Sequence, residues 1–337
     1  MGSGSWSTNV YDAAARYRAG SGTGAFAYSD RVTGSSPRSS WAAHPSLDPK
    51  GLTLRESRDS AEHPTSLAIA VLFDVTGSMR KVPQVLQTKL PELFGLLLRK
   101  GYTEHPQVMF GAVGDATCDR VPLQIGQFES DNRMDDDLGN ILLEGGGGGQ
   151  MTESYELALY TMARHTALDC HEKRGRRGYL FLIGDEMPYG KVKAREVRDV
   201  LGEHIPQDIP ITDILTELQR TYHVHYILPA GSSYVGNPEV LGLWRKLLGQ
   251  NVIELDDLDA VCETIALTVG LGEEAIDLAA GLADLADVGS AAGQSVGKAL
   301  AGLDRKRRTT GARGAALAVS DAPLTDGAAG PATTTRL

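Results

Sequence analysis

The fold of this chain is decided by the stretch Leu67-Ala-Ile-Ala-Val-Leu-Phe-Asp74-Val-Thr76-Gly-Ser78-Met79. Its first seven residues are apolar, as in a strand that is buried on both faces of a parallel sheet. Apolar residues at helical spacing follow from Met79 to about residue 100. A strand, a polar turn and a helix therefore succeed one another. In open α/β sheets such a turn lies at the carboxyl edge of the strands, where ligands bind.

The turn after this strand carries the donors that a hard divalent cation prefers. Asp74 supplies a carboxylate, and Thr76 and Ser78 supply hydroxyl groups. Gly77 between them lets the backbone bend tightly toward an ion. These oxygen donors suit Mg²⁺ or Mn²⁺, and Mg²⁺ takes about six oxygens at roughly 2.0–2.1 Å, several of them from water. Three protein oxygens are too few, so we expect further ligands from later loops.

Residues 74–78 resemble the Asp-x-Ser/Thr-x-Ser motif of von Willebrand factor A (vWA) domains. In that family, a metal-ion-dependent adhesion site (MIDAS) is completed by a threonine from a second loop and an aspartate from a third. The second loop here is residues 145–155, and the third follows the apolar residues 178–183 and ends in Gly184-Asp185. The resemblance covers about residues 62–275. It implies the metal ligands Asp74, Thr76, Ser78, Thr152 and Asp185.

The second loop leaves the identity of one ligand open. Family members commonly place the threonine about five residues before the first small residue of the next helix, and counting back from Ala158 reaches Glu153. Thr152 and Ser154 flank that position. Thr152 is favoured because it follows the glycine run, while Glu153 as a direct carboxylate ligand is the competing interpretation. A glutamate would make the site more anionic and less attractive to an acidic ligand.

A further loop, residues 114–119, is expected to end at the same edge of the sheet. It leaves a strand, residues 107–113, that should neighbour the first one. Its carboxylates, Asp115 and Asp119, are candidates for supporting the metal ligands or for binding a partner.

The remaining patterns complete a doubly wound α/β fold. We predict a mostly parallel six-stranded sheet with helices on both faces and disordered flanks. The strands are expected at residues 67–73, 107–113, 121–128, 178–183, 222–228 and 251–255, the third as an antiparallel edge strand. Helices are expected near residues 79–100, 154–163, 209–222, 238–248 and 257–271.

The flanks differ in composition from this central region. Residues 1–61 are rich in Gly and Ser, which predicts a disordered leader, or alternatively a docking segment anchored by its aromatic residues. Residues 62–275 are the expected vWA domain. Residues 276–308 read as an Ala-rich amphipathic helix, broken near residues 289–293 and followed by the basic cluster Arg305–Arg308. Residues 309–337 are expected to be a disordered tail.

Composition narrows the setting in which the protein works. The formal net charge of −10 argues against broad nucleic-acid binding. The three cysteines are widely separated and form no CxxC pair, which favours a reducing compartment. Neither a secretory signal nor an apolar run long enough to span a membrane is recognisable. We therefore expect a cytoplasmic protein that does not enter a membrane.

The resemblance implies a non-enzymatic, Mg²⁺- or Mn²⁺-dependent protein-binding module. A glutamate or aspartate of the partner would complete the metal coordination, and intracellular members often work beside AAA+ ATPases or other assemblies. The first alternative is a Mg²⁺-dependent phosphotransferase resembling haloacid dehalogenases, with Asp74 as nucleophile. The second is a metal-independent scaffold that binds through the leader or the Ala-rich helix.

Overall fold

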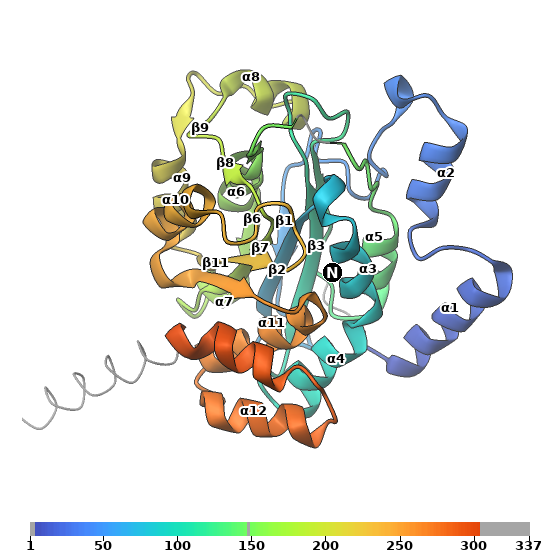
Figure 1. The fold of residues 1–337 in the computed structure, drawn as a ribbon, viewed down its shortest axis with the longest axis vertical. Coiled ribbons are helices and arrows are strands. Elements are labelled where there is room, and N and C mark those ends of the chain that lie inside the picture. The colour runs from blue at the N-terminus through green and yellow to red at the C-terminus, as the bar shows by residue number, and fades with distance from the viewer. Residues whose placement is uncertain (1–3, 147–148, 304–337) are drawn as a thin grey trace, which may run out of the picture.

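The computed structural model describes residues 4–146 and 149–303, and its centre is a six-stranded sheet in the order β12-β11-β7-β2-β3-β4 (Figure 1). Neighbouring strands are parallel except β3 and β4, which pair antiparallel. This confirms the predicted doubly wound sheet, including its antiparallel edge strand. The strands are β2 (Leu67–Asp74), β3 (Pro106–Val113), β4 (Leu123–Ile125), β7 (Gly178–Ile183), β11 (Tyr222–Pro229) and β12 (Val252–Leu255).

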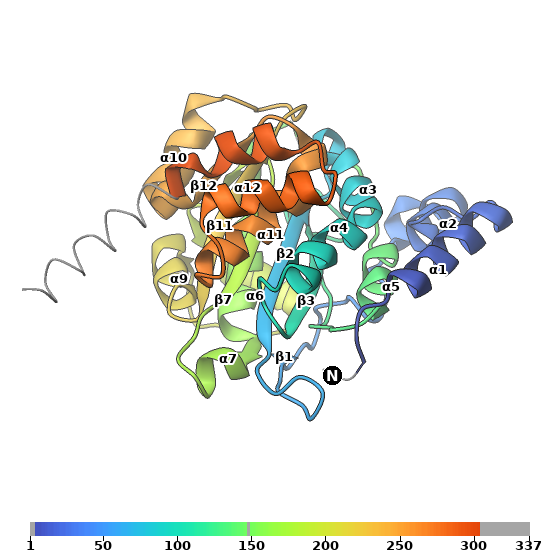
Figure 2. The same cartoon turned by 90° about the horizontal axis from the view of Figure 1, so that it is seen from below.

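Helices flank the sheet and bury its strands from both faces (Figure 2). All eight residues of β2 are buried, which requires cover on both sides. On one face α11 packs against α3 and α4, and on the other α6 packs against α9. The main helices are α3 (Lys81–Thr88), α4 (Leu90–Phe94), α5 (Arg133–Gly139), α6 (Tyr155–Arg164), α9 (Ile211–Leu218), α10 (Pro238–Leu248) and α11 (Val261–Gly272).

Shorter elements connect these helices and strands. Two are π-helical, η3 (Gly95–Arg99) and η4 (Val197–Leu201), and four are 3₁₀ turns, η1 (Arg38–Ser40), η2 (Gly77–Met79), η5 (Gly249–Asn251) and η6 (Leu258–Ala260). Short strands form three additional pairs, β1 (Arg55–Ser57) with β6 (Thr166–Leu168), β5 (Thr152–Glu153) with β8 (Met187–Pro188), and β9 (Lys191–Val192) with β10 (Ile209–Pro210). The remaining short helices are α7 (Asp169–Glu172) and α8 (Ala194–Glu196).

The helix predicted near residues 79–100 is divided into α3, α4 and the π-helix η3. Pro91 lies in the first turn of α4, where its missing N–H is tolerated, and it cannot continue a helix from the preceding turn. The apolar spacing therefore predicted the buried face correctly but not the interruption.

The chain reverses its progress across the sheet beside β2. From β2 it proceeds to β3 and β4 on one side, and it then places β7, β11 and β12 on the other side. The carboxyl ends of β2 and β7 thus form a topological switch point, where open α/β sheets bind ligands. Asp74 ends β2, and Asp185 follows shortly after β7.

The leader is ordered where the structure describes it, residues 4–61, so the prediction of disorder is wrong there. It forms α1 (Thr8–Ser21) and α2 (Ala27–Ser35), which lie beside α5 in Figure 1. The Trp6 ring stacks on Phe94 with a centroid distance of 4.7 Å, and the Tyr11 hydroxyl donates to the Gln87 carbonyl at 2.8 Å. Contacts with the domain stabilise these short helices more than an amphipathic pattern of their own does. Trp6 and Tyr11 of the leader therefore dock on this chain itself.

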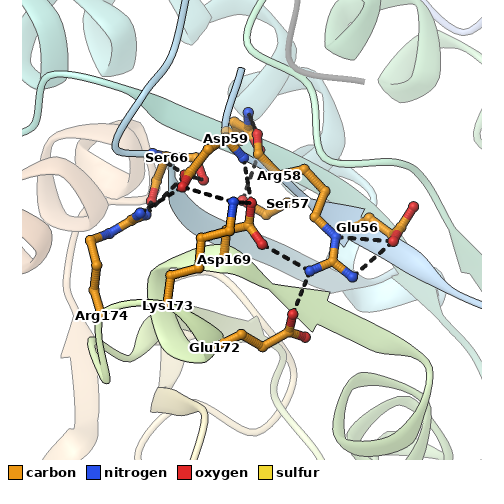
Figure 3. Close-up of polar contacts among 10 residues, drawn as sticks. Glu56, Ser57, Arg58, Asp59, Ser66, Asp169, Glu172, Lys173 and Arg174 are labelled. Atoms are coloured by element: carbon orange, nitrogen blue, oxygen red, sulfur yellow. Dashed lines mark hydrogen bonds and ion pairs between the residues drawn. The ribbon is translucent and has the colours of Figure 1, made fainter. Parts of the chain in front are cut away.

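Charged side chains fasten the end of the leader to the amino edge of the sheet (Figure 3). Arg58 donates to Asp169 at 2.9 Å, and Asp59 pairs with Arg174 at 2.7 Å. The Ser66 backbone N–H, just before β2, also donates to Asp59 at 3.0 Å. This ion-pair network lies at the end of the sheet opposite to the carboxyl edge of β2.

The C-terminal extension is helical and is interrupted as predicted. α12 (Leu278–Asp287) ends before Gly289, and helix resumes at residue 293 and continues to residue 303. Leu285, Val296 and Leu300 are buried, so the apolar face packs on the domain. The predicted basic cluster, residues 305–308, and the predicted tail, residues 309–337, lie outside the described residues. Of the helices that the structure describes, none combines the length and apolarity needed to cross a membrane.

Candidate metal centre

Asp74 is a fully buried acid at the carboxyl edge of the sheet. It ends β2 with no solvent exposure, and its Oδ1 accepts a hydrogen bond from the Thr76 backbone N–H at 2.6 Å. Its Oδ2 accepts from the Tyr155 hydroxyl at 3.1 Å. Burial raises the pKa of Tyr155 well above its usual range, so the phenol keeps the proton that it donates. A Cβ at Gly184 would collide with this hydroxyl, which explains why glycine precedes Asp185.

Asp185 and Ser78 meet from two different loops. The Ser78 hydroxyl donates to Asp185 Oδ1 at 3.2 Å. Asp185 Oδ2 accepts from the backbone N–H groups of Ser233 and Tyr234 at 2.7 and 3.3 Å. The structure therefore brings together the first and third parts of the predicted MIDAS, and it fixes Asp185 through the loop that follows β11.

Glu153 reaches the centre from the second loop. The strand pair β5–β8 sets Thr152 beside Met187 and Glu153 beside Pro188. Glu153 is 1% exposed, and its Oε2 has no hydrogen-bond partner among the described residues. Thr152 is only partly buried. The sequence left Thr152 and Glu153 open as the ligand from the second loop. Of these two, it is Glu153 that lies buried next to Asp74.

Glu186 belongs to the same centre and was missed as a site residue in the sequence. One ligand oxygen from each of Asp74, Glu153 and Glu186 lies within 4.8 Å of the others. The Glu186 backbone carbonyl accepts hydrogen bonds from the Tyr226 hydroxyl at 3.0 Å and from the Trp244 indole N–H at 2.8 Å. The adjacent pair Asp185-Glu186 at a strand end was the available signal.

These four carboxylates form one buried group. In the described part of the chain, no ion pair involves Asp74, Glu153, Asp185 or Glu186. Burial raises the pKa of all four, and the charges of neighbouring carboxylates in the group raise those of Asp74, Glu153 and Glu186 further. Buried carboxylates without a partner are costly. We call Asp74, Glu153, Asp185 and Glu186 the acidic centre.

The acidic centre fits a divalent cation by its donors and by its unsatisfied atoms. Oxygens at about 2.1 Å from one shared Mg²⁺ lie at most about 4.2 Å apart, so small side-chain rotations would bring the triad of Asp74, Glu153 and Glu186 into range. The Thr76 hydroxyl oxygen, Glu153 Oε2 and Glu186 Oε2 are buried without hydrogen-bond partners among the described residues. A hard cation would satisfy such oxygens and compensate their charge.

Two other candidate residues, Asp115 and Ser154, make hydrogen bonds between the loops around the acidic centre. Asp115 is fully buried, and its carboxylate accepts hydrogen bonds from Thr117, Gln150 and Tyr189. The Ser154 hydroxyl accepts from the Ala116 backbone N–H at 2.9 Å. The structure therefore gives both residues a role in joining loop 114–119 to the second loop.

Asp119 is held by the leader. Arg38 Nη2 lies 3.2 Å from Asp119 Oδ1 and 2.6 Å from Glu144 Oε1. The residues of the second loop that follow Glu144 contact the motif itself, because the Gly77 N–H donates to the Gly146 carbonyl at 3.0 Å. A Cβ at Gly146 would collide with Asp119, so this close approach requires glycine. Arg38 thus joins the leader to two loops that border the acidic centre.

Replacing Arg38 with alanine should detach the leader from these loops. The change leaves two buried carboxylates without their cation, and we expect a loss of about 1–2 kcal/mol in the free energy of unfolding, limited by the half-exposed position of Arg38. Urea unfolding measures the loss, and hydrogen exchange should increase in residues 114–119. Arg31→Ala, which removes only a contact over the Tyr28 ring, is the matched control. Equal stability and exchange in the two variants would refute the role of Arg38.

Comparisons with known proteins find distant structural similarity. The chain is similar over 67% of its length to the pilus adhesin SpaC from Lactobacillus rhamnosus GG in its open conformation, with 11% identity, 31% of that chain covered and a TM-score of 0.44. Over 61% of its length it is similar to proximal thread matrix protein 1 from the mussel byssus, with a zinc-occupied MIDAS motif in that protein, at 12% identity, 47% coverage of that chain and a TM-score of 0.40. The chain spans less than half the length of these structures. No family model and no curated protein matches it. The fold assignment rests on the strand order and register described above.

Proposed function

We propose that this protein is a non-enzymatic, divalent-cation-dependent protein-binding module of the vWA type. The observation that carries the proposal is the acidic centre at the switch point of the sheet, in which Glu153 Oε2 and Glu186 Oε2 are buried without a hydrogen-bond partner among the described residues. Asp74, Ser78 and Asp185 would hold the ion, with Thr76, Glu153 and Glu186 at the same edge. Mg²⁺ or Mn²⁺ is the proposed ion because all these donors are oxygens.

The bound ion would supply an electrophilic position for a ligand oxygen at the carboxyl edge of the sheet. We propose that a glutamate or aspartate of a partner protein fills it, within a larger assembly such as one built around an AAA+ ATPase. Backbone amides orient Asp185, and Tyr155 orients Asp74, so the ligands are fixed before a partner arrives. The three cysteines are free, which supports a reducing compartment such as the cytoplasm.

The test is metal-dependent capture of a partner by the full chain. Immobilised wild type and Asp74→Asn are exposed to host extract with Mg²⁺ or with EDTA, and retained proteins are quantified by mass spectrometry. We expect a set of proteins retained only by the wild type in Mg²⁺, and lost when an acidic residue of the partner is replaced. Equal retention by Asp74→Asn would contradict the proposal, whatever EDTA does to the extract.

The two alternatives give different results in the same material. A phosphotransferase would form a phosphoenzyme on Asp74, detectable as a mass increase after incubation with a phosphoryl donor. The ion pairs favour the binding function over the phosphotransferase, because no lysine in the described part of the chain forms an ion pair with Asp74 or Asp185. A metal-independent scaffold would capture the same proteins in EDTA and from Asp74→Asn.

A further inference from the structure

The acidic centre contains more negative charge than one divalent cation can balance. The five ligands that match the MIDAS pattern include only two carboxylates, Asp74 and Asp185, which together balance one divalent ion. Glu153 and Glu186 add two more carboxylates to the same buried region. With one ion bound, the ionised centre would keep two negative charges and would repel an acidic partner.

The donors divide into two sets that share Asp74. The first set is the motif, in which Ser78 and Asp185 are in contact at 3.2 Å. The second set is the triad of Asp74, Glu153 and Glu186, with ligand oxygens within 4.8 Å of one another. Asp185 is not part of that triad. Asp185 completes the motif and Glu186 completes the triad. These are therefore two different side chains of the same loop.

The side chains of the second set are built into the fold as ligands would be. Glu153 is 1% and Glu186 is 8% exposed, and each has an oxygen without a hydrogen-bond partner among the described residues. The register of β5 with β8 places Glu153 directly beside the residues that follow Glu186. Pairs of metal ions about 3.5–4 Å apart that share a carboxylate are a known solution for such donor sets.

We propose that the acidic centre binds two divalent cations, one held by Asp74, Ser78 and Asp185 and the other by Asp74, Glu153 and Glu186. Two divalent ions balance the four carboxylates, and the neutral centre then accepts the carboxylate of a partner. This inference rests on the proposed metal centre and explains how an acid-rich site can serve an acidic ligand.

The experiment is a titration of the full chain with Mn²⁺ by isothermal calorimetry, with native mass spectrometry to count bound ions. The wild type should bind two Mn²⁺ per chain, and Glu153→Gln and Glu186→Gln should each bind one. Both substitutions keep the side-chain shape and remove repulsion, so the variants should fold, and far-UV circular dichroism verifies this. Glu239→Gln is the matched control on an exposed turn of α10 and should bind two.

Each outcome decides a different part of the proposal. One Mn²⁺ in the wild type would overturn the second site and leave the metal-dependent binding function standing. Two Mn²⁺ in both the wild type and Glu186→Gln would place the second ion elsewhere and overturn the assignment. No bound Mn²⁺ in any form would overturn the proposed function as well.

Discussion

Replacing Asp74 with alanine should abolish the stabilisation that divalent cations give to the folded chain. Asp74 is common to both donor sets, so its loss removes a ligand from every ion that the centre holds. An ion present at a hundredfold excess over its Kd stabilises a protein by about 2.7 kcal/mol. In a domain of this size that corresponds to a rise in Tm of roughly 5–10 °C, which the variant should not show.

Thermal unfolding of wild type and variant in saturating Mg²⁺ and in EDTA measures this difference. In EDTA the variant loses a buried carboxylate that repels its neighbours, but it also leaves the Thr76 N–H and the Tyr155 hydroxyl without their acceptor. The quantity compared is therefore the rise in Tm that Mg²⁺ gives to each form, rather than the Tm in EDTA. Asp213→Ala, at an exposed position of α9, is the control and should keep the full metal response. A metal response in Asp74→Ala equal to that of the wild type would remove Asp74 from the site.

Raising the pH should destabilise the metal-free protein. The pKa values of Asp74, Glu153 and Glu186 are raised in the folded state by burial and by the neighbouring carboxylates. The folded state therefore binds more protons than the unfolded state, and the free energy of unfolding falls as pH rises from about 4 through the raised pKa values. Each unit by which a pKa is raised contributes about 1.4 kcal/mol, so the total loss should be several kcal/mol.

Urea unfolding in EDTA over a pH series measures this loss. The double variant Glu153→Gln with Glu186→Gln should show a much flatter profile, because two of the four carboxyl groups of the acidic centre no longer titrate. In Mg²⁺ the wild type should gain stability from the ion as pH rises, since the ion binds the deprotonated carboxylates. A metal-free wild type whose stability does not depend on pH over this range would contradict the electrostatic account of the acidic centre.

The strands were predictable because their residues are mostly apolar and are bounded by polar turns. β2, β3, β7 and β11 begin within one residue of the predicted positions, and α10 spans the predicted residues. A strand buried on both faces leaves little freedom in its sequence. Asp74 and Asp185 each come at the end of a predicted parallel strand, so the sequence also predicted that both lie at the carboxyl edge of the sheet.

The second loop and the leader were harder to predict for different physical reasons. Which of Thr152 and Glu153 faces Asp74 depends on the pairing of β5 with β8, and a shift of one residue exchanges the two faces. Glu186 comes to the centre through the same pairing. The leader's order depends on contacts such as Trp6 with Phe94, which have no local period in the sequence.

The most direct test of the acidic centre is a crystal structure of the full chain grown with Mn²⁺, with diffraction recorded at the manganese absorption edge. The account predicts anomalous density within about 2.0–2.3 Å of Asp74 oxygens, with Glu153 and Asp185 as further ligands. Well-ordered side chains at the carboxyl ends of β2 and β7, with no anomalous density beside Asp74, would contradict it.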